Sequence, residues 1–107
     1  MDTKIKKGLL DLCVLSVLKQ KDMYGYEIVQ NISKSIEVSE GTIYPILRRL
    51  NKEGFFESYI KESTEGPARK YYRITALGIL HYEKQLNSWY KLKNGIEKIL
   101  QRGDNDE

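Results

Sequence analysis

The alternation of hydrophobic and polar positions predicts three helices in the first half of the chain. Residues 4–20 carry apolar side chains on nearly every side, which is typical of a helix covered over most of its surface. A second helix is predicted from about Gly25, and its inward stripe holds Ile28, Val29, Ile32 and Ile36. A third helix is predicted to end near Gly54, and its apolar side carries Ile43, Ile46, Leu47 and Leu50.

The start of the third helix depends on Pro45, because proline lacks a backbone N–H and clashes with the carbonyl four residues earlier. We expect the helix to begin near Gly41 or Thr42, which places Pro45 in its first turn; the alternative is a start at Ser39 with a bend. Its outer side is slim and basic, with Gly41, Pro45, Arg48 and Lys52 flanked by Thr42, Tyr44 and Arg49. Two helices joined by a tight turn, of which the second carries a basic outer side, indicate a helix-turn-helix.

A basic β-hairpin is predicted directly after the third helix. Residues 55–60 are aromatic and partly alternating, and Gly66-Pro67 opens a second strand that runs to residue 74. Alternation along this strand places Tyr72 and Ile74 on the inward face, with Tyr71 and Arg73 on the other. Residues 39–73 hold seven Lys/Arg against five Asp/Glu, so the positive charge gathers on this hairpin and the preceding helix.

A long helix is predicted from Thr75, a good N-cap residue, to about Gln101. At ~1.5 Å per residue it would be roughly 40 Å long, more than a small domain can cover. Residues recur along it at alternating spacings of three and four, namely Ile79, Tyr82, Leu86, Trp89, Lys93, Ile96 and Leu100. Such a heptad seam needs another helix, most simply from a second subunit. The alternative is a helix that packs against its own chain.

These elements predict a mainly α fold with a small β-hairpin, that is, a winged helix-turn-helix followed by a long C-terminal dimerisation helix. We expect a winged helix-turn-helix DNA-binding domain over residues 1–74, a dimerisation helix over 75–102 and a frayed tail over 103–107.

Composition narrows the function classes. A chain of 107 residues with 31% charged residues and a net charge of +3 suits one compact, water-soluble domain. Cys13 is the single cysteine, so an internal disulfide is impossible and a reduced core thiol in a cytoplasmic protein is expected. We expect neither a signal peptide nor a membrane span, because Asp11 interrupts the first apolar run. No phosphate loop, metal-ligand cluster or nucleophile constellation appears, so we expect neither an enzyme nor a cofactor.

The outer side of the third helix supplies the predicted contacts to double-stranded DNA. Arg48 is the first candidate for a base edge, because a guanidinium can pair with guanine N7 and O6. Further candidates on this helix and near helix starts are Tyr24, Ser39, Gly41, Thr42, Tyr44, Pro45 and Arg49, of which Arg49 is alternatively a solvated charge. In the hairpin, Arg69 and Lys70 are expected to meet the backbone or the minor groove, and Pro67 to stiffen the tip.

Three motifs together resemble the PadR family of transcriptional regulators over nearly the whole chain. They are Tyr24-Gly25-Tyr26-Glu27-Ile28, the run from Gly41 to Leu50, and the run from Gly66 to Thr75. The single C-terminal helix resembles the small subgroup of that family. The segment from Arg69 to Trp89, including Ser88-Trp89, is similar to that of a multidrug-resistance regulator in the subgroup.

The resemblance implies a homodimeric repressor whose first and last helices form the dimer interface, with an apolar pore of paired tryptophans in drug-binding members. The interface residues are then Ile5, Leu9, Leu12, Ile79, Tyr82, Leu86, Trp89, Ile96 and Leu100. A planar aromatic ligand that relieves operator binding would contact Leu12, Leu15, Tyr82, Leu86, Trp89 and Lys93. From spacing alone, these aromatic residues are alternatively dimer core. The alternative function is a winged helix that binds protein without specific DNA binding.

Overall fold

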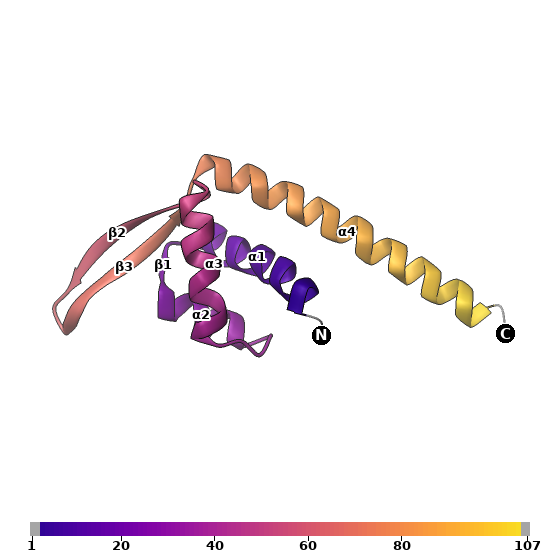
Figure 1. Ribbon diagram of the computed structural model, residues 1–107, viewed down its shortest axis with the longest axis horizontal. Helices are drawn as coiled ribbons and strands as arrows, with labels where there is room; N and C mark the ends of the chain where they lie inside the picture. The colour runs from indigo at the N-terminus through magenta and orange to yellow at the C-terminus, as the bar shows by residue number, and fades with distance from the viewer. Residues whose placement is uncertain (1–2, 106–107) are drawn as a thin grey trace.

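The computed structural model describes residues 3–105, with side chains over residues 8–104. Within this part, a small helical head carries a projecting β-hairpin, here called the wing, and a long C-terminal helix that leaves the head (Figure 1). The order is α1 (Thr3–Gln20), β1 (Met23–Tyr24), α2 (Gly25–Ser33), α3 (Glu40–Lys52), β2 (Phe56–Ser63), β3 (Gly66–Ile74) and α4 (Ala76–Asn105). The predicted fold class is confirmed.

The core of the head joins α1, α2 and α3 to the base of the sheet. All four apolar residues predicted for α3 are buried, as are Ile28, Val29 and Ile32 of α2. Ile36 does not belong to the stripe as predicted, because α2 ends at Ser33 and the Ile36 side chain is 36% exposed. Apolar residues all round α1 are explained by its contacts with α2, α3, β3 and α4.

The start of α3 differs from the favoured prediction. The helix begins at Glu40, the Ser39 carbonyl accepts hydrogen bonds from the Thr42 and Ile43 amides, and Pro45 is its sixth residue. Pro45 therefore lies in the second turn rather than the first. Gly41 and Pro45 are both exposed, so water can hydrate the Gly41 carbonyl that Pro45 cannot reach.

The end of α3 matches the prediction. Gly54 adopts a φ of 85°, the left-handed conformation that glycine reaches at little cost. The Gly54 amide donates to the Asn51 carbonyl and the Phe55 amide to the Leu50 carbonyl, so both orphan carbonyls are paired. This turn sets the direction in which the chain enters β2.

The sheet is antiparallel with the order β1-β3-β2. Tyr72 pairs with Met23 on one side and Ser58 on the other. Tyr72 is buried and Ile74 half-buried, while Arg73 is exposed, as the alternation predicts. β1 is missing from the sequence prediction because two residues are too few to show a period of two.

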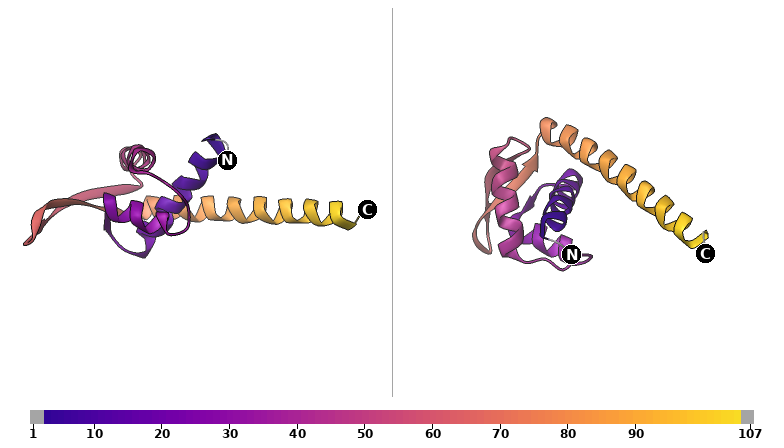
Figure 2. Two further views of the ribbon diagram at one scale, coloured as in Figure 1. Left: turned by 90° about the horizontal axis from the view of Figure 1, so that it is seen from below. Right: turned by 45° about the vertical axis from the view of Figure 1, so that its right-hand side comes forward.

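The helix α4 starts as predicted. The Thr75 hydroxyl accepts a hydrogen bond from the Gly78 amide at 3.0 Å and donates one to the Gly54 carbonyl at 2.7 Å. The helix continues to Asn105, so the prediction of a frayed tail is wrong for residues 103–105; residues 106 and 107 lie outside the described part. Figure 2 shows the far half of α4 extending beyond the head. Among the described residues, no helix combines the length and apolarity that a bilayer crossing requires.

Candidate nucleic-acid interface

The outer face of α3 exposes a narrow surface that carries Arg48 and, near the end of the helix, Lys52. Gly41, Thr42, Pro45 and Arg48 are exposed, as is Ser39 just before the helix. Tyr44 is half-buried, because its ring lies against Gly25 so closely that a Cβ there would overlap it. Burial is the main cause that raises the pKa of Tyr44, followed by the Glu40 charge. The Tyr44 phenol is thus fixed at the edge of the exposed face.

The inner face of the wing meets α3 at a positively charged corner. The Lys70 ammonium lies 5.6 Å from the centroid of the Tyr72 ring. Burial raises the pKa of Tyr72, and the nearby Arg48 charge acts in the opposite direction. Arg48 from α3 and Lys70 from β3 therefore both lie near Tyr72, although 22 positions separate them in the sequence.

The outer face of the wing carries a ladder of three tyrosines with cations above them. The Tyr71 ring contacts Tyr24 edge-on, with 5.5 Å between centroids, and stacks on Tyr59 at 5.7 Å. The Arg69 guanidinium lies 4.5 Å above Tyr24, and Lys61 lies 5.3 Å from Tyr71. Arg69 and Lys70 consequently face opposite sides of the wing, and Lys70 is the one on the side of α3. Pro67 is exposed near the tip.

Arg49 does not belong to the outer face of α3, where it was predicted to be a contact to DNA. Its Nη2 donates to both carboxylate oxygens of Asp11 on α1, at 2.6 and 2.7 Å. This hydrogen bond is the main cause that raises the pKa of Arg49. Nη1 lies 3.8 Å from Glu53, so the guanidinium is engaged by two acids of its own chain. Arg49 therefore joins α3 to α1, and its charge already has partners within the chain.

A second network of hydrogen bonds and ion pairs, which was not predicted from the sequence, fixes the base of the wing. The Asp22 carboxylate accepts a hydrogen bond from the Tyr59 hydroxyl at 2.7 Å and one from Arg73 Nε at 3.3 Å. The bond to Asp22 is the main cause that raises the pKa of Tyr59. Arg73 also lies 3.4 Å from Glu57. Asp22 sits in a short polar break between elements, where no local pattern reveals a partner 37 positions away.

Two apolar grooves lie on either side of Trp89 where α1 meets α4. The first, of ≈ 300 Å³, also involves α2 and is lined by Leu12, Cys13, Ile32, Tyr82, Leu86 and Trp89 among others. The second, of ≈ 340 Å³, includes Leu9, Leu12, Ser88, Trp89 and Leu92. Leu12 and Trp89 line both. Cys13 is half-buried rather than fully buried, and burial raises its pKa.

Several predicted ligand and interface residues do not line either groove. Leu15 is fully buried in the core of the head, so it does not line a ligand groove as predicted. Lys93 lines neither groove beside Trp89, because its ammonium turns to Glu97 at 3.4 Å. Ile79 is half-buried, whereas Ile96 and Leu100 are 45% and 62% exposed. The Ile5 side chain lies outside the described residues.

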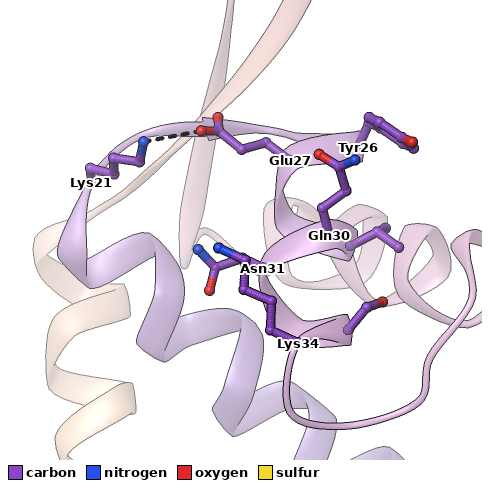
Figure 3. Close-up of a pocket in the computed structure, with 8 residues that line it drawn as sticks. Lys21, Tyr26, Glu27, Gln30, Asn31 and Lys34 are labelled. Atoms are coloured by element: carbon purple, nitrogen blue, oxygen red, sulfur yellow. Dashed lines mark ion pairs between the residues drawn. The ribbon is translucent and has the colours of Figure 1, made fainter.

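A polar groove of ≈ 740 Å³ runs along the outward side of α2 (Figure 3). Lys21 and Glu27 form an ion pair at 3.0 Å at one end of the groove. Tyr26, Gln30 and Lys34 also line the groove. Of the two lysines that line the groove, Lys21 is paired with Glu27, whereas Lys34 is exposed.

The helix-turn-helix, the wing beside it and the cationic corner between them define a winged helix of the DNA-binding class. A model of the "transcriptional regulator PadR-like family" matches residues 14–84. The chain belongs to the PadR-like family and is a DNA-binding transcriptional regulator. The family, and with it the class of protein, is thus the one that the three motifs predicted.

Individual relatives agree with this assignment. A PadR-like transcriptional regulator from Bacillus cereus is 39% identical to this chain and superposes on it with a TM-score of 0.84. The match covers 92% of this chain and 98% of the Bacillus cereus chain. A transcriptional regulator from Clostridium thermocellum is 37% identical, with 90% and 97% covered and a TM-score of 0.80. A Lysinibacillus sphaericus protein, named uncharacterized protein X, is 37% identical over 91% of this chain and 93% of its own. The narrower resemblance to a multidrug-resistance regulator stays a prediction.

Proposed function

We propose that the protein is a homodimeric repressor whose α4 helices pair across a two-fold axis. The observation that carries this proposal is the apolar surface on the far half of α4, where four side chains are roughly half to two-thirds exposed: Leu92 58%, Ile96 45%, Ile99 58% and Leu100 62%. Soluble monomers rarely leave such a contiguous apolar surface in water. A second α4 would cover it and continue the seam of Leu86 and Trp89.

Each head of the dimer would place α3 in the major groove of one half-site. Arg48 is the proposed base contact, while Gly41 and Pro45 keep the helix face slim and Thr42 and Tyr44 border it. Tyr24 and Ser39 are proposed phosphate contacts at the starts of α2 and α3, and Lys70, Arg69 and Pro67 are proposed contacts of the wing. The operator would be roughly two-fold symmetric, with half-sites one helical turn or a multiple apart. A dimer bound there would exclude other proteins from that DNA, which is how it would act as a repressor.

The α1–α4 surface is the proposed site of a planar aromatic ligand. Leu12 and Trp89 separate two apolar grooves on each subunit, and pairing across the two-fold would bring the two Trp89 rings toward one slot. Flat apolar ligands stack well between aromatic rings. The Lys93 charge is balanced by Glu97, so shape rather than charge would govern ligand choice.

Sedimentation equilibrium at micromolar concentration tests the dimer. We expect about twice the 12.5 kDa chain mass for the natural protein, and the single-chain mass for Leu100→Glu, which places a charge in the proposed seam. Lys98→Glu on the same helix is the matched control and should remain dimeric. A natural protein that sediments at 12.5 kDa would contradict the proposal.

Selection from a random duplex library tests the DNA-binding part. We expect the purified protein to enrich a two-fold symmetric sequence, and Arg48→Ala to enrich it poorly. If the natural protein enriched no sequence, the alternative of a winged helix used for protein binding would be favoured.

A further inference from the structure

A large apolar side chain is exposed on the inner face of the wing. Ile60 lies in the middle of β2 and is 65% exposed. Alternate residues of a strand share one face, so Ile60 shares its face with Phe56 and Ser58. Phe56 is buried against the head, which identifies this face as the one on the side of α3.

Ile60 continues the cationic corner toward the wing tip. Its cross-strand partner is Lys70, and the next pair on the same face is Ser58 with Tyr72. Successive pairs on one face are about 7 Å apart. The exposed isoleucine is therefore the next side chain outward from the tyrosine near which Arg48 and Lys70 lie.

The charges around Ile60 indicate the chemistry of its partner. Lys70 is directly opposite Ile60 on the same face, whereas Lys61, the next residue of the strand, lies over Tyr71 on the outer face. A purely apolar partner would remove Lys70 from water without offering it an anion, which is costly. Duplex DNA offers phosphates beside the apolar sugar edges of the minor groove, so it satisfies both the cation and the isoleucine.

We propose that Ile60 enters the minor groove and selects A·T over G·C at the base pairs that the wing covers. A G·C pair places the guanine N2 amino group on the floor of that groove, whereas an A·T pair does not. An isoleucine against the amino group would leave this donor without a partner. Ile60 is then a specificity-determining residue, and Lys70 anchors the wing to the adjacent phosphate. This inference rests on the proposed operator binding.

The test is a scan of the selected duplex in which each base pair in turn is A·T, G·C or inosine·C. Inosine·C keeps much of the major-groove pattern of G·C but lacks the N2 amino group, so it separates the two grooves. At the base pairs under the wing, we expect the natural protein to bind inosine·C about as well as A·T, and G·C about five- to tenfold more weakly.

Ile60→Thr should remove this discrimination. Threonine also favours strands, and the side chain is mostly exposed, so the variant should unfold at the same temperature as the natural protein. We expect its G·C to inosine·C ratio to approach one, with an unchanged dependence of affinity on salt because no phosphate contact is lost. Lys70→Ala is the control, since it should weaken all three duplexes alike and reduce the salt dependence.

The outcomes separate the two proposals. Suppose the natural protein selects a duplex but binds G·C and inosine·C equally well under the wing, or the Ile60→Thr variant still binds G·C more weakly than inosine·C. Either result overturns the role of Ile60 and leaves the proposed operator binding intact. A natural protein that selects no duplex overturns the proposed operator binding, and the role of Ile60 with it.

Discussion

At the scale of single residues, the charges near α3 divide into two groups by their partners. Arg48 and Lys70 are exposed and lie near Tyr72 without an ion pair among the described contacts, whereas Arg49 is held by Asp11 and Glu53. A cation without an acid partner gains most from a phosphate or a base edge, because it loses no ion pair on binding. We therefore expect a change at Arg48 to alter DNA binding and a change at the neighbouring Arg49 to alter stability.

Arg48→Ala should weaken binding to the selected duplex by ~1–3 kcal/mol and relax the preference at one base position. Lys70→Ala should weaken binding to all sequences alike and lower the slope of log affinity against log salt by about one. Fluorescence anisotropy titrations at several salt concentrations measure both. If neither change altered duplex affinity, the corner between α3 and the wing would not be the contact surface.

Arg49→Gln should act on stability instead. The change leaves the Asp11 carboxylate, which is 19% exposed, without its cation; because Arg49 is itself 35% exposed, the loss should be only about 1 kcal/mol in the free energy of unfolding. Urea denaturation measures it, and Asp11→Asn should cost a similar amount. A reduced salt slope of DNA binding in Arg49→Gln would show that Arg49 contacts phosphate after all.

At the scale of elements, close backbone contacts form the junction between α3, the sheet and α4. The Phe55 carbonyl accepts a hydrogen bond from the Thr75 amide at 3.0 Å, and Gly78 lies directly against the same carbonyl. The Thr75 hydroxyl ties the start of α4 to Gly54. This junction fixes the direction in which α4 leaves the head, and two changes test it.

Thr75→Ala should destabilise the protein by about 1–2 kcal/mol, since it removes the cap of α4 and the bond to the Gly54 carbonyl. Thr75→Ser keeps the hydroxyl and should lose little. Thermal unfolding followed by circular dichroism compares the two. Equal losses would mean that the methyl group of Thr75, rather than its hydroxyl, holds the junction.

Gly78→Ala should destabilise the protein by about 1–3 kcal/mol, although alanine is the better helix former. An added Cβ would overlap the Phe55 carbonyl and push it away from the Thr75 amide. Gly95→Ala is the matched change on the same helix, where a Cβ meets nothing within 4 Å, and it should stabilise by up to about 1 kcal/mol. Chemical denaturation of both variants should therefore give shifts of opposite sign.

At the scale of the whole molecule, a small head carries the wing and the long helix α4, which extends away from it. The molecule measures 63 × 27 × 21 Å, and its longest dimension runs from the tip of the wing to the far end of α4 (Figure 1). The first half of α4 packs on α1, whose Asp11 holds Arg49 of α3. Asp11 and Arg49 therefore link α1, on which α4 packs, to α3, the helix that we propose faces DNA.

A planar aromatic dye should bind at the Trp89 grooves and weaken operator binding, and operator DNA should weaken dye binding by the same factor. The coupling should be on the order of 1–3 kcal/mol. Trp89 is the only tryptophan in the sequence, so quenching of its emission reports dye binding in each subunit. Trp89→Leu keeps an apolar side chain as the control; because this variant has no tryptophan emission, the fluorescence anisotropy of the dye itself compares dye affinity in the two proteins. Equal dye affinity in both proteins would leave Trp89 with a purely structural role.

The sequence by itself determined the features that depend on neighbours along the chain. The stripe of α3, the glycine turn at Gly54, the cap at Thr75 and the alternation around Tyr72 all follow from short-range geometry, and three motifs identified the family. The role of Arg49, the position of Leu15 in the core and the strand β1 required the tertiary structure. A sequence period tells which side of a helix is buried, but the partner of a charge depends on which distant element the fold brings beside it. For the same reason, only the folded wing shows that Ile60 is exposed and shares its face with Lys70.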